Sequence, residues 1–192
     1  MKILVIDNYD SFTYNLVQYI ERIDGTEVVV ARNDKISLEK VQEFDKIVIS
    51  PGPGVPDEAG ITKELIATYG ATKSILGVCL GHQSIAEVYG GSIRNLDTVY
   101  HGVASDMHKT VRDEYLFKGV PDLFDAGRYH SWIVVEETLP DCLEVTVRNK
   151  EGDIMALRHK EYDVRGVQFH PESVLTEYGG MMIKNWIEGN SN

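Results

Sequence analysis

The stretch Ser74-Ile75-Leu76-Gly77-Val78-Cys79-Leu80-Gly81-His82-Gln83 places a cysteine at the junction of a strand and a helix. Residues 75–78 form a short, bounded apolar run, which is typical of a buried strand. The following segment, Ser84–Tyr89, carries apolar residues at helical spacing and stops at Gly90-Gly91. The order strand, sharp turn, helix is that of a nucleophile elbow, with sulfur as the nucleophile.

Cys79 is therefore a candidate catalytic nucleophile. The glycines at 77 and 81 allow the backbone to pack closely where side chains would collide. The N-terminus of a helix supplies partial positive charge and free N–H groups, which favour a thiolate over a thiol. The alternative interpretation is a buried structural cysteine, the usual role of a lone cysteine in an apolar run.

The rest of the first half alternates strands with helices. Strands that are apolar throughout and joined by helices indicate a parallel sheet covered on both faces. With right-handed crossovers this predicts an open, doubly wound α/β sheet of the flavodoxin-like kind. The predicted strands are residues 3–6, 28–31 and 47–50, and the predicted helices are residues 13–22, 37–43 and 61–69.

The second half changes to short strand-like runs separated by turn signals, of which Asn149–Asp153 is one. These runs predict antiparallel strands appended to the parallel sheet, followed by a terminal helix at residues 181–188. No linker or repeat interrupts the chain, so we expect a single domain over residues 1–192. The predicted strands are residues 100–103, 124–129, 143–148, 154–159 and 164–169.

Composition excludes several classes of partner. The formal net charge of −11 disfavours nucleic acid and anionic membrane surfaces, both of which require a basic face. The two cysteines, Cys79 and Cys142, are too few for a secreted disulfide scaffold. No apolar run approaches the length of a membrane span, and the first residues do not form a signal peptide. The expected location is the cytoplasm.

Ligands of open α/β sheets bind at the carboxyl ends of the strands. Asp7–Ser11, Pro51–Gly54 and Cys79 each follow a predicted strand, so they should share one edge of the molecule. The glycines of Pro51-Gly52-Pro53-Gly54 leave N–H groups exposed. One of these N–H groups, together with that of Leu80, could bind the oxyanion of a tetrahedral intermediate. The alternative is a plain tight turn.

A thiolate needs a base, and the best candidate is His170 at the end of the last predicted strand. Pro171 holds His170 in an extended conformation, so the side chains of His170 and Glu172 project to a common side. Glu172 can then fix the tautomer of the imidazole while the other ring nitrogen faces Cys79. The alternative is a surface His-Pro-Glu turn.

The remaining histidines and the second cysteine show less specific patterns. His101, His108 and His159 lack the spacing of a zinc site, so no metal site is expected in this chain. His82 either faces solvent or packs beside the elbow, and Cys142 has no neighbouring base. No dinucleotide or Walker motif is present.

Together these motifs resemble the class I, triad-type glutamine amidotransferases. Cys79 in Gly-x-Cys-x-Gly-x-Gln matches their nucleophile motif, and His170-Pro171-Glu172 matches their base and acid. Asp7–Asn15 is similar to the opening of the chorismate-directed branch, the small subunits of anthranilate synthase and aminodeoxychorismate synthase. Ser50–Gly54 and His130-Ser131 also fit this branch, and the resemblance covers nearly the whole chain.

Two positions depart from the branch. It often shows His-Gly-Lys-x-Ser where this chain has His101-Gly102-Val103-Ala104-Ser105, and a leucine where this chain has Trp132. The first departure bears on which synthase is served, and the second on how the amino-acid end of the substrate is held. Neither affects the triad.

The resemblance implies a mechanism in which Cys79 attacks the side-chain amide of L-glutamine, His170 moves protons and Glu172 orients His170. Leu80 and either Gly52 or Gly54 would form the oxyanion hole. The residues that would hold glutamine are Gly52, Pro53, Gly54, Gln83, Ser131 and Trp132.

The resemblance also implies a partner. Ammonia should pass to a larger chorismate-binding subunit that forms anthranilate for tryptophan biosynthesis and needs magnesium, whereas this chain needs no cofactor. The first alternative is an aminodeoxychorismate synthase partner, or service to both synthases. The others are a self-contained hydrolase of γ-glutamyl peptides and a noncatalytic binding subunit.

Overall fold

The computed structural model describes residues 1–189 of the chain. Its first strand, β1 (Lys2–Asp7), shows how the apolar residues divide between two faces of a sheet. Ile3 and Val5 belong to one buried core, and Leu4 and Ile6 belong to the other. Successive side chains of a strand point to opposite faces, so an uninterrupted apolar run requires cover on both sides.

The described elements follow the predicted alternation in the first half. The helices are α1 (Thr13–Glu21), α2 (Leu38–Val41), α3 (Thr62–Tyr69), α4 (Leu80–Val88) and α5 (Gly179–Glu188). The strands after β1 are β2 (Glu27–Arg32), β3 (Lys46–Ile49), β4 (Ser74–Val78), β5 (Ile93–Asn95), β6 (Val103–Lys109), β7 (Leu123–Arg128), β8 (Trp132–Val134), β9 (Leu143–Asn149), β10 (Ile154–His159) and β11 (Val164–Val167).

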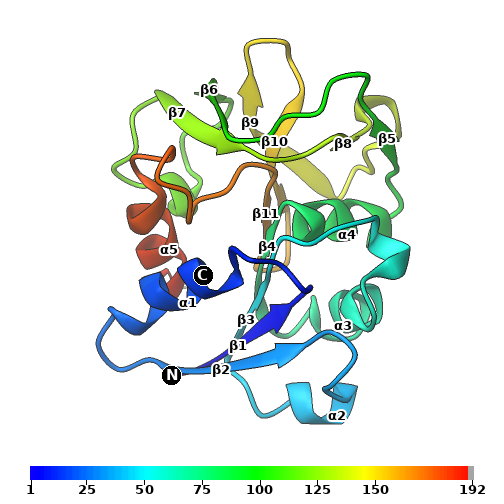
Figure 1. Cartoon of the computed structure of the whole chain (residues 1–192), viewed down its shortest axis with the longest axis vertical. Coiled ribbons are helices and arrows are strands. Elements are labelled where there is room, and N and C mark those ends of the chain that lie inside the picture. The colour runs from blue at the N-terminus through cyan, green and yellow to red at the C-terminus, as the bar shows by residue number, and fades with distance from the viewer. Residues whose placement is uncertain (190–192) are drawn as a thin grey trace.

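Nine of the strands form one mixed sheet in the order β2-β1-β3-β4-β11-β10-β9-β6-β7. The strands from β2 to β11 in this order are parallel, and those from β11 to β7 are antiparallel. Figure 1 shows the antiparallel part above the parallel part. The predicted α/β sheet, with antiparallel strands in the C-terminal half, is confirmed.

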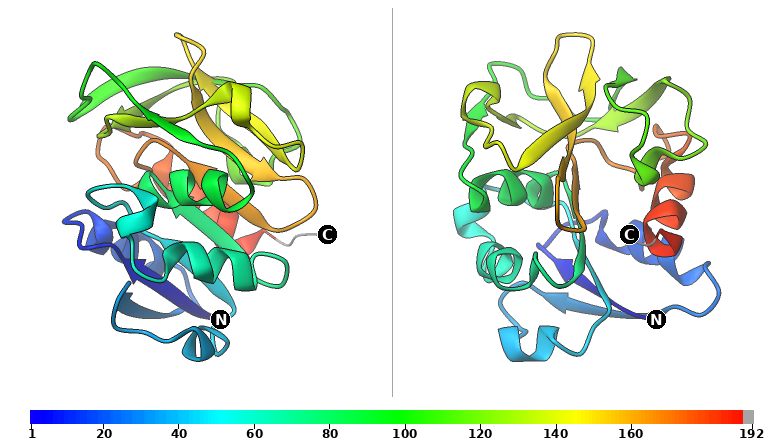
Figure 2. Two further views of the ribbon diagram at one scale, coloured as in Figure 1. Left: turned by 90° about the vertical axis from the view of Figure 1, so that its right-hand side faces the viewer. Right: turned by 180° about the vertical axis from the view of Figure 1, so that it is seen from behind.

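Helices cover both faces of the parallel strands. Helices α1 and α5 pack together on one face, and α3 and α4 pack together on the other (Figures 1 and 2). Trp186 of α5 is fully buried in the first core, and Ile85 of α4 is fully buried in the second. This layering leaves the carboxyl ends of the parallel strands free to carry loops.

The structure corrects one predicted strand and adds two. Residues 100–103 do not form the predicted strand, because Gly102 has a φ of 73° and the strand β6 begins only at Val103. In β6 Met107 is buried and most other side chains are not, so the segment lacks the alternation that marks a strand. The short strands β5 and β8 pair with each other in a separate two-stranded sheet that was not predicted.

None of the helices among residues 1–189 is long and apolar enough to cross a membrane. A single domain over residues 1–192 stays a prediction, and residues 190–192 lie outside the described part of the chain.

Candidate active site

Cys79 lies between β4 and α4 in a backbone conformation that few residues adopt. Its φ is 51° and its ψ is −98°, and its side chain is 6% exposed. A non-glycine residue held in such a region costs about 1–3 kcal/mol and marks a site that the surrounding structure over-determines. The elbow predicted from the sequence is therefore present, with Cys79 as the residue that precedes the helix.

The glycines beside Cys79 make this turn possible. A Cβ atom at Gly77 would lie 2.5 Å from the carbonyl carbon of Gly81, and one at Gly81 would lie 2.7 Å from the carbonyl oxygen of Ile49. Strand β4, helix α4 and strand β3 thus meet with no room for side chains. The close packing points the first N–H groups of α4, which have no intrahelical partner, toward the carboxyl end of the sheet.

The loop Pro51–Gly54 approaches the elbow from β3. A Cβ at Gly52 would lie 2.5 Å from Cβ of Asn8 and 2.8 Å from Cδ2 of Leu80, and Gly54 has a φ of 75°. Loop 9–12, the Pro51–Pro53 segment and Cys79 line one cavity. The prediction that these segments share one edge is confirmed.

A buried polar network supports this loop from beneath. The Asn8 side-chain amide donates to the carbonyl of Ser50 at 2.8 Å, and the Asn8 backbone N–H donates to Oγ of Ser50 at 2.9 Å. The side chains of Asn33 and Thr62 donate to Oδ1 of Asn8. Asn8 is 2% exposed, and both polar atoms of its side chain are hydrogen-bonded inside the protein.

His170 and Glu172 form a buried pair. Nδ1 of His170 lies 2.7 Å from Oε1 of Glu172, and the two residues are 2% and 3% exposed. Burial alone would lower the pKa of His170, but the Glu172 carboxylate and the Cys79 thiol raise it to about 10. Nε2 of His170 makes no hydrogen bond to the residues described, and His170 and Cys79 line the same cavity.

Two aromatic rings enclose the imidazole of His170. The rings of Tyr129 and Phe12 lie 4.8 Å and 5.5 Å from it, centroid to centroid, and 5.0 Å from each other. Sequence reasoning missed both residues, because a single aromatic in a loop or at a strand end carries no periodic signal. They pack against the ring of His170, which is buried together with Glu172.

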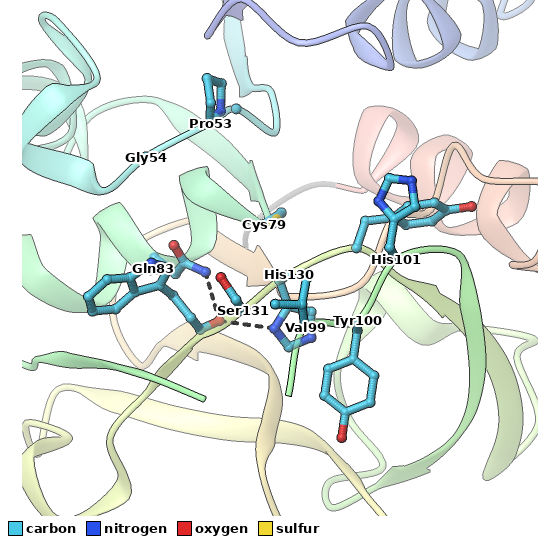
Figure 3. A pocket seen from close by; sticks show the side chains of 12 residues that line it. Pro53, Gly54, Cys79, Gln83, Val99, Tyr100, His101, His130 and Ser131 are labelled. Atoms are coloured by element: carbon cyan, nitrogen blue, oxygen red, sulfur yellow. Dashed lines mark hydrogen bonds between the residues drawn. The ribbon is translucent and has the colours of Figure 1, made fainter. Parts of the chain in front are cut away.

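Cys79 also lines a second cavity, and Figure 3 shows the lining of this cavity. All the residues predicted to hold the substrate lie in it: Gly52, Pro53, Gly54, Gln83, Ser131 and Trp132. His130, which with Ser131 follows a predicted strand and was expected to present a polar backbone edge to a substrate, also lines it. The residues that line it and were not predicted to bind substrate are Val99, Tyr100, His101 and Tyr129.

The wall formed by Ser131 and Trp132 is fixed through a main-chain oxygen. The Trp132 carbonyl accepts hydrogen bonds from Nε2 of Gln83 and from Nδ1 of His130, both at 3.0 Å (Figure 3). Burial and the neighbouring Arg128 guanidinium lower the pKa of His130 to about 3. His130 is therefore neutral at physiological pH.

The remaining candidates lie outside the cavities. His82 is fully buried beside the elbow, where its ring packs on Gly166 and burial lowers its pKa to about 4. Cys142 is a free, half-buried cysteine. Within residues 1–189, no group of three or more His, Cys, Asp or Glu side chains could hold a metal ion.

The architecture and the cavity can be compared with known proteins. Residues 4–189 match the family model described as glutamine amidotransferase class-I. The crystal structure of a GMP synthase protein from Thermoplasma acidophilum superposes with a TM-score of 0.86 over 97% of this chain and 92% of its own, at 25% identity.

Curated relatives cover almost the same length. The chain is 50% identical over 188 residues to the aminodeoxychorismate/anthranilate synthase component 2 of Bacillus subtilis, covering 97% of this chain and 95% of the relative. It is 46% identical to the anthranilate synthase component 2 of Pseudomonas putida, covering 98% and 97%. It is 47% identical to the aminodeoxychorismate synthase component 2 of Klebsiella aerogenes, covering 96% and 98%.

The sheet order and the elbow define an α/β protein with a nucleophile-type turn. The family match and these identities make the assignment specific: the chain belongs to the class I glutamine amidotransferases, in the branch of component 2 of anthranilate and aminodeoxychorismate synthases.

Proposed function

We propose that this chain hydrolyses the side-chain amide of L-glutamine through a thioester on Cys79. The observation that carries the proposal is the juxtaposition at one edge of the sheet. A strained cysteine at a helix N-terminus lines the same cavity as a histidine whose other ring nitrogen is held by a buried carboxylate. This is the arrangement of nucleophile, base and orienting acid that triads share.

The first half-reaction releases ammonia. The Cys79 thiolate attacks the amide carbon, and the carbonyl oxygen becomes an oxyanion held by N–H groups of Leu80 and of Gly52 or Gly54. His170 gives its proton to the amide nitrogen, the C–N bond breaks and ammonia leaves a γ-glutamyl thioester. The raised pKa of His170 keeps it protonated for this step.

The second half-reaction regenerates the enzyme. Neutral His170 takes a proton from water, the hydroxide attacks the thioester carbon, and the C–S bond breaks to release glutamate and the thiolate. Glu172 keeps Nδ1 of His170 protonated, so that Nε2 alone exchanges protons with the reacting groups.

The cavity lined by Cys79, Gln83 and Trp132 is the proposed glutamine site. Nε2 of Gln83 already donates to Trp132 and to Gln168, so Gln83 would receive a hydrogen bond from glutamine through Oε1. Gly52, Pro53 and Gly54 supply a wall that admits the substrate close to the backbone. Ser131 and Trp132 supply another wall.

We propose that ammonia passes to a larger chorismate-binding subunit that produces anthranilate for tryptophan biosynthesis. The names of the relatives support such a partner, since each is component 2 of a synthase. Magnesium would be required by that larger subunit, and the glutaminase chemistry uses protein side chains alone. A cytoplasmic location is part of the same proposal.

Service to aminodeoxychorismate synthase is the second candidate. It is favoured by the names of the Bacillus and Klebsiella relatives, at 50% and 47% identity. Complementation separates the two: rescue of a tryptophan auxotroph alone supports anthranilate synthesis, rescue of a p-aminobenzoate auxotroph alone supports the alternative, and rescue of both supports a shared subunit.

Glutamine hydrolysis with and without the synthase subunit tests the proposal. We expect weak hydrolysis by the chain alone and strong hydrolysis after the subunit is added, because an unregulated glutaminase would waste glutamine. Equal, high rates would contradict this dependence. Turnover of γ-glutamyl peptides by the chain alone would favour a self-contained hydrolase.

A further inference from the structure

A continuous path of hydrogen bonds connects a buried arginine with the sulfur of Cys79. It passes from Arg128 through the side chain of His130, the carbonyl of Trp132 and the side chain of Gln83 to Gln168. Nε2 of Gln168 then lies 3.5 Å from Sγ of Cys79. Four side chains belong to this path, and each of these residues is at most 5% exposed: Arg128, His130, Gln83 and Gln168.

The donor direction is fixed at the first link. An arginine can only donate, so Nε2 of His130, which lies 3.1 Å from Nε of Arg128, must accept. The neutral ring of His130 therefore carries its proton on Nδ1 and donates it to the Trp132 carbonyl. The guanidinium itself is held over the ring of Tyr100 at 3.5 Å.

The Trp132 carbonyl accepts hydrogen bonds from both His130 and Gln83, and it fixes the orientation of the two glutamine amides. The Trp132 carbonyl can only accept, so the atom of Gln83 beside it must be the amide nitrogen. The second proton of that nitrogen goes to Oε1 of Gln168 at 3.2 Å. The remaining terminus of Gln168 is then its NH₂ group, and this group faces Cys79. A flipped amide at Gln83 would bring oxygens together, and a flipped amide at Gln168 would set two NH₂ groups against each other.

We propose that Gln168 is a catalytic residue that donates a hydrogen bond to the Cys79 thiolate, and that Arg128, His130 and Gln83 are positioning residues. Arg128 and His130 hold the Trp132 carbonyl in place, and this carbonyl and Gln83 fix the direction of the Gln168 amide. The inference rests on the proposed function, in which that thiolate is the nucleophile. Gln168 lies on the extension of β11, whose last paired residue, Val167, is opposite Val78. The sheet therefore places the amide beside the sulfur.

His170 and Gln168 then perform different tasks at the same sulfur. His170 exchanges protons with the reacting groups, whereas an amide of Gln168 does not titrate and donates throughout the cycle. A hydrogen bond to a charged acceptor stabilises that charge, so the amide enlarges the thiolate fraction. Its loss should move the midpoint of Cys79 alkylation upward by about one pH unit, the low end for such bonds because the contact is long.

The test is the pH dependence of Cys79 alkylation by iodoacetamide, measured in the full chain with Cys142→Ser as background. The midpoint should rise by about one pH unit in Gln168→Leu, which removes the amide at similar volume. The matched control Gln18→Leu, at an exposed glutamine of α1, should leave it unchanged. An unchanged midpoint in folded Gln168→Leu, or in Gln168→Met if the leucine variant does not fold, overturns the proposal.

Two measurements test the positioning residues. The ¹⁵N shifts of His130 in the unsubstituted protein should report a proton on Nδ1, and a proton on Nε2 overturns the path. His130→Asn, whose amide can donate from the position of Nδ1, should keep the midpoint near that of the parent, whereas His130→Leu should raise it. Equal midpoints in these two variants contradict the positioning role.

Alkylation requires neither glutamine nor a partner, so the two proposals fail separately. A midpoint shift in a chain that never hydrolyses glutamine would support the role of Gln168 and contradict the proposed function. Normal glutamine hydrolysis by Gln168→Leu with an unchanged midpoint would support the proposed function and contradict the role of Gln168.

Discussion

Replacing Gly77 by alanine should push helix α4 away from strand β4 and displace Cys79 between them. The new Cβ would lie 2.5 Å from the carbonyl carbon of Gly81, 2.6 Å from its oxygen and 2.7 Å from Cδ1 of Ile85. Ordinary contacts begin at 3.4 Å, so the gap is short by about 0.9 Å. Ile85 can turn, but the Gly81 backbone cannot, because Gly81 itself is packed against Ile49 of β3.

Helix α4 must therefore move away from β4 by close to 1 Å, and Cys79 moves with it. Overpacking of this kind costs about 1–3 kcal/mol. In a chain of this length each kcal/mol lowers Tm by about 2–4 °C, so Tm should fall by about 2–12 °C. Misplacing a reacting group by 1 Å lowers the rate by about a hundredfold.

Thermal unfolding of the Gly77→Ala variant and its glutaminase rate with the synthase subunit measure both effects. Gly180→Ala is the matched control, since the three atoms nearest to a Cβ there belong to the side-chain ring of Tyr19, the first at 3.0 Å, and alanine favours the helix. The control should retain its Tm and its rate. A Gly77→Ala variant with the Tm and rate of the parent protein would refute the packing argument.

Three further predictions follow from buried contacts. In Glu172→Gln the pKa of His170 should fall from about 10 toward 6.5. The loss in free energy of unfolding should therefore be greatest below pH 6.5 and should vanish as the pH rises through 10. Denaturant unfolding across this range measures the loss, and a loss that does not change with pH would contradict the prediction. Asn8→Asp sets a carboxylate against the Ser50 carbonyl and should lower the free energy of unfolding by about 1–3 kcal/mol. Urea unfolding measures this change, and a variant as stable as the parent protein would contradict it. Trp132→Leu keeps the carbonyl that holds Gln83, so KM for glutamine should change less than about threefold. A larger rise would assign the contact with substrate to the indole.

The parallel half of the fold was predictable because its strands are apolar on both faces. Ile3–Ile6 and Ile75–Val78 could occupy only the interior of a covered sheet, and the structure places them there. The strand β6 was missed because Met107 is buried while most of its neighbours are not. Its pairing with β7 and β9 depends on backbone hydrogen bonds, which leave no pattern in the side chains.

The site residues also divide into those that the sequence predicts and those that it does not. Cys79, His170 and Glu172 were named from the sequence because their local motifs predict what each side chain faces. Gln168 and Arg128 were not, since each acts through contacts between distant segments: Gln168 with Gln83, and Arg128 with Tyr100. Such contacts follow from the order of strands in the sheet, which no local motif specifies.

The most direct test of the account is to trap the reaction in progress. The complex of this chain with its synthase subunit is quenched in acid during glutamine turnover, and its peptides are analysed by mass spectrometry. A γ-glutamyl group on the Cys79 peptide is the predicted result, with none on the Cys142 peptide and none in a Cys79→Ser variant. Sustained ammonia release with Cys79 unmodified, or by the Cys79→Ser variant, would contradict the account.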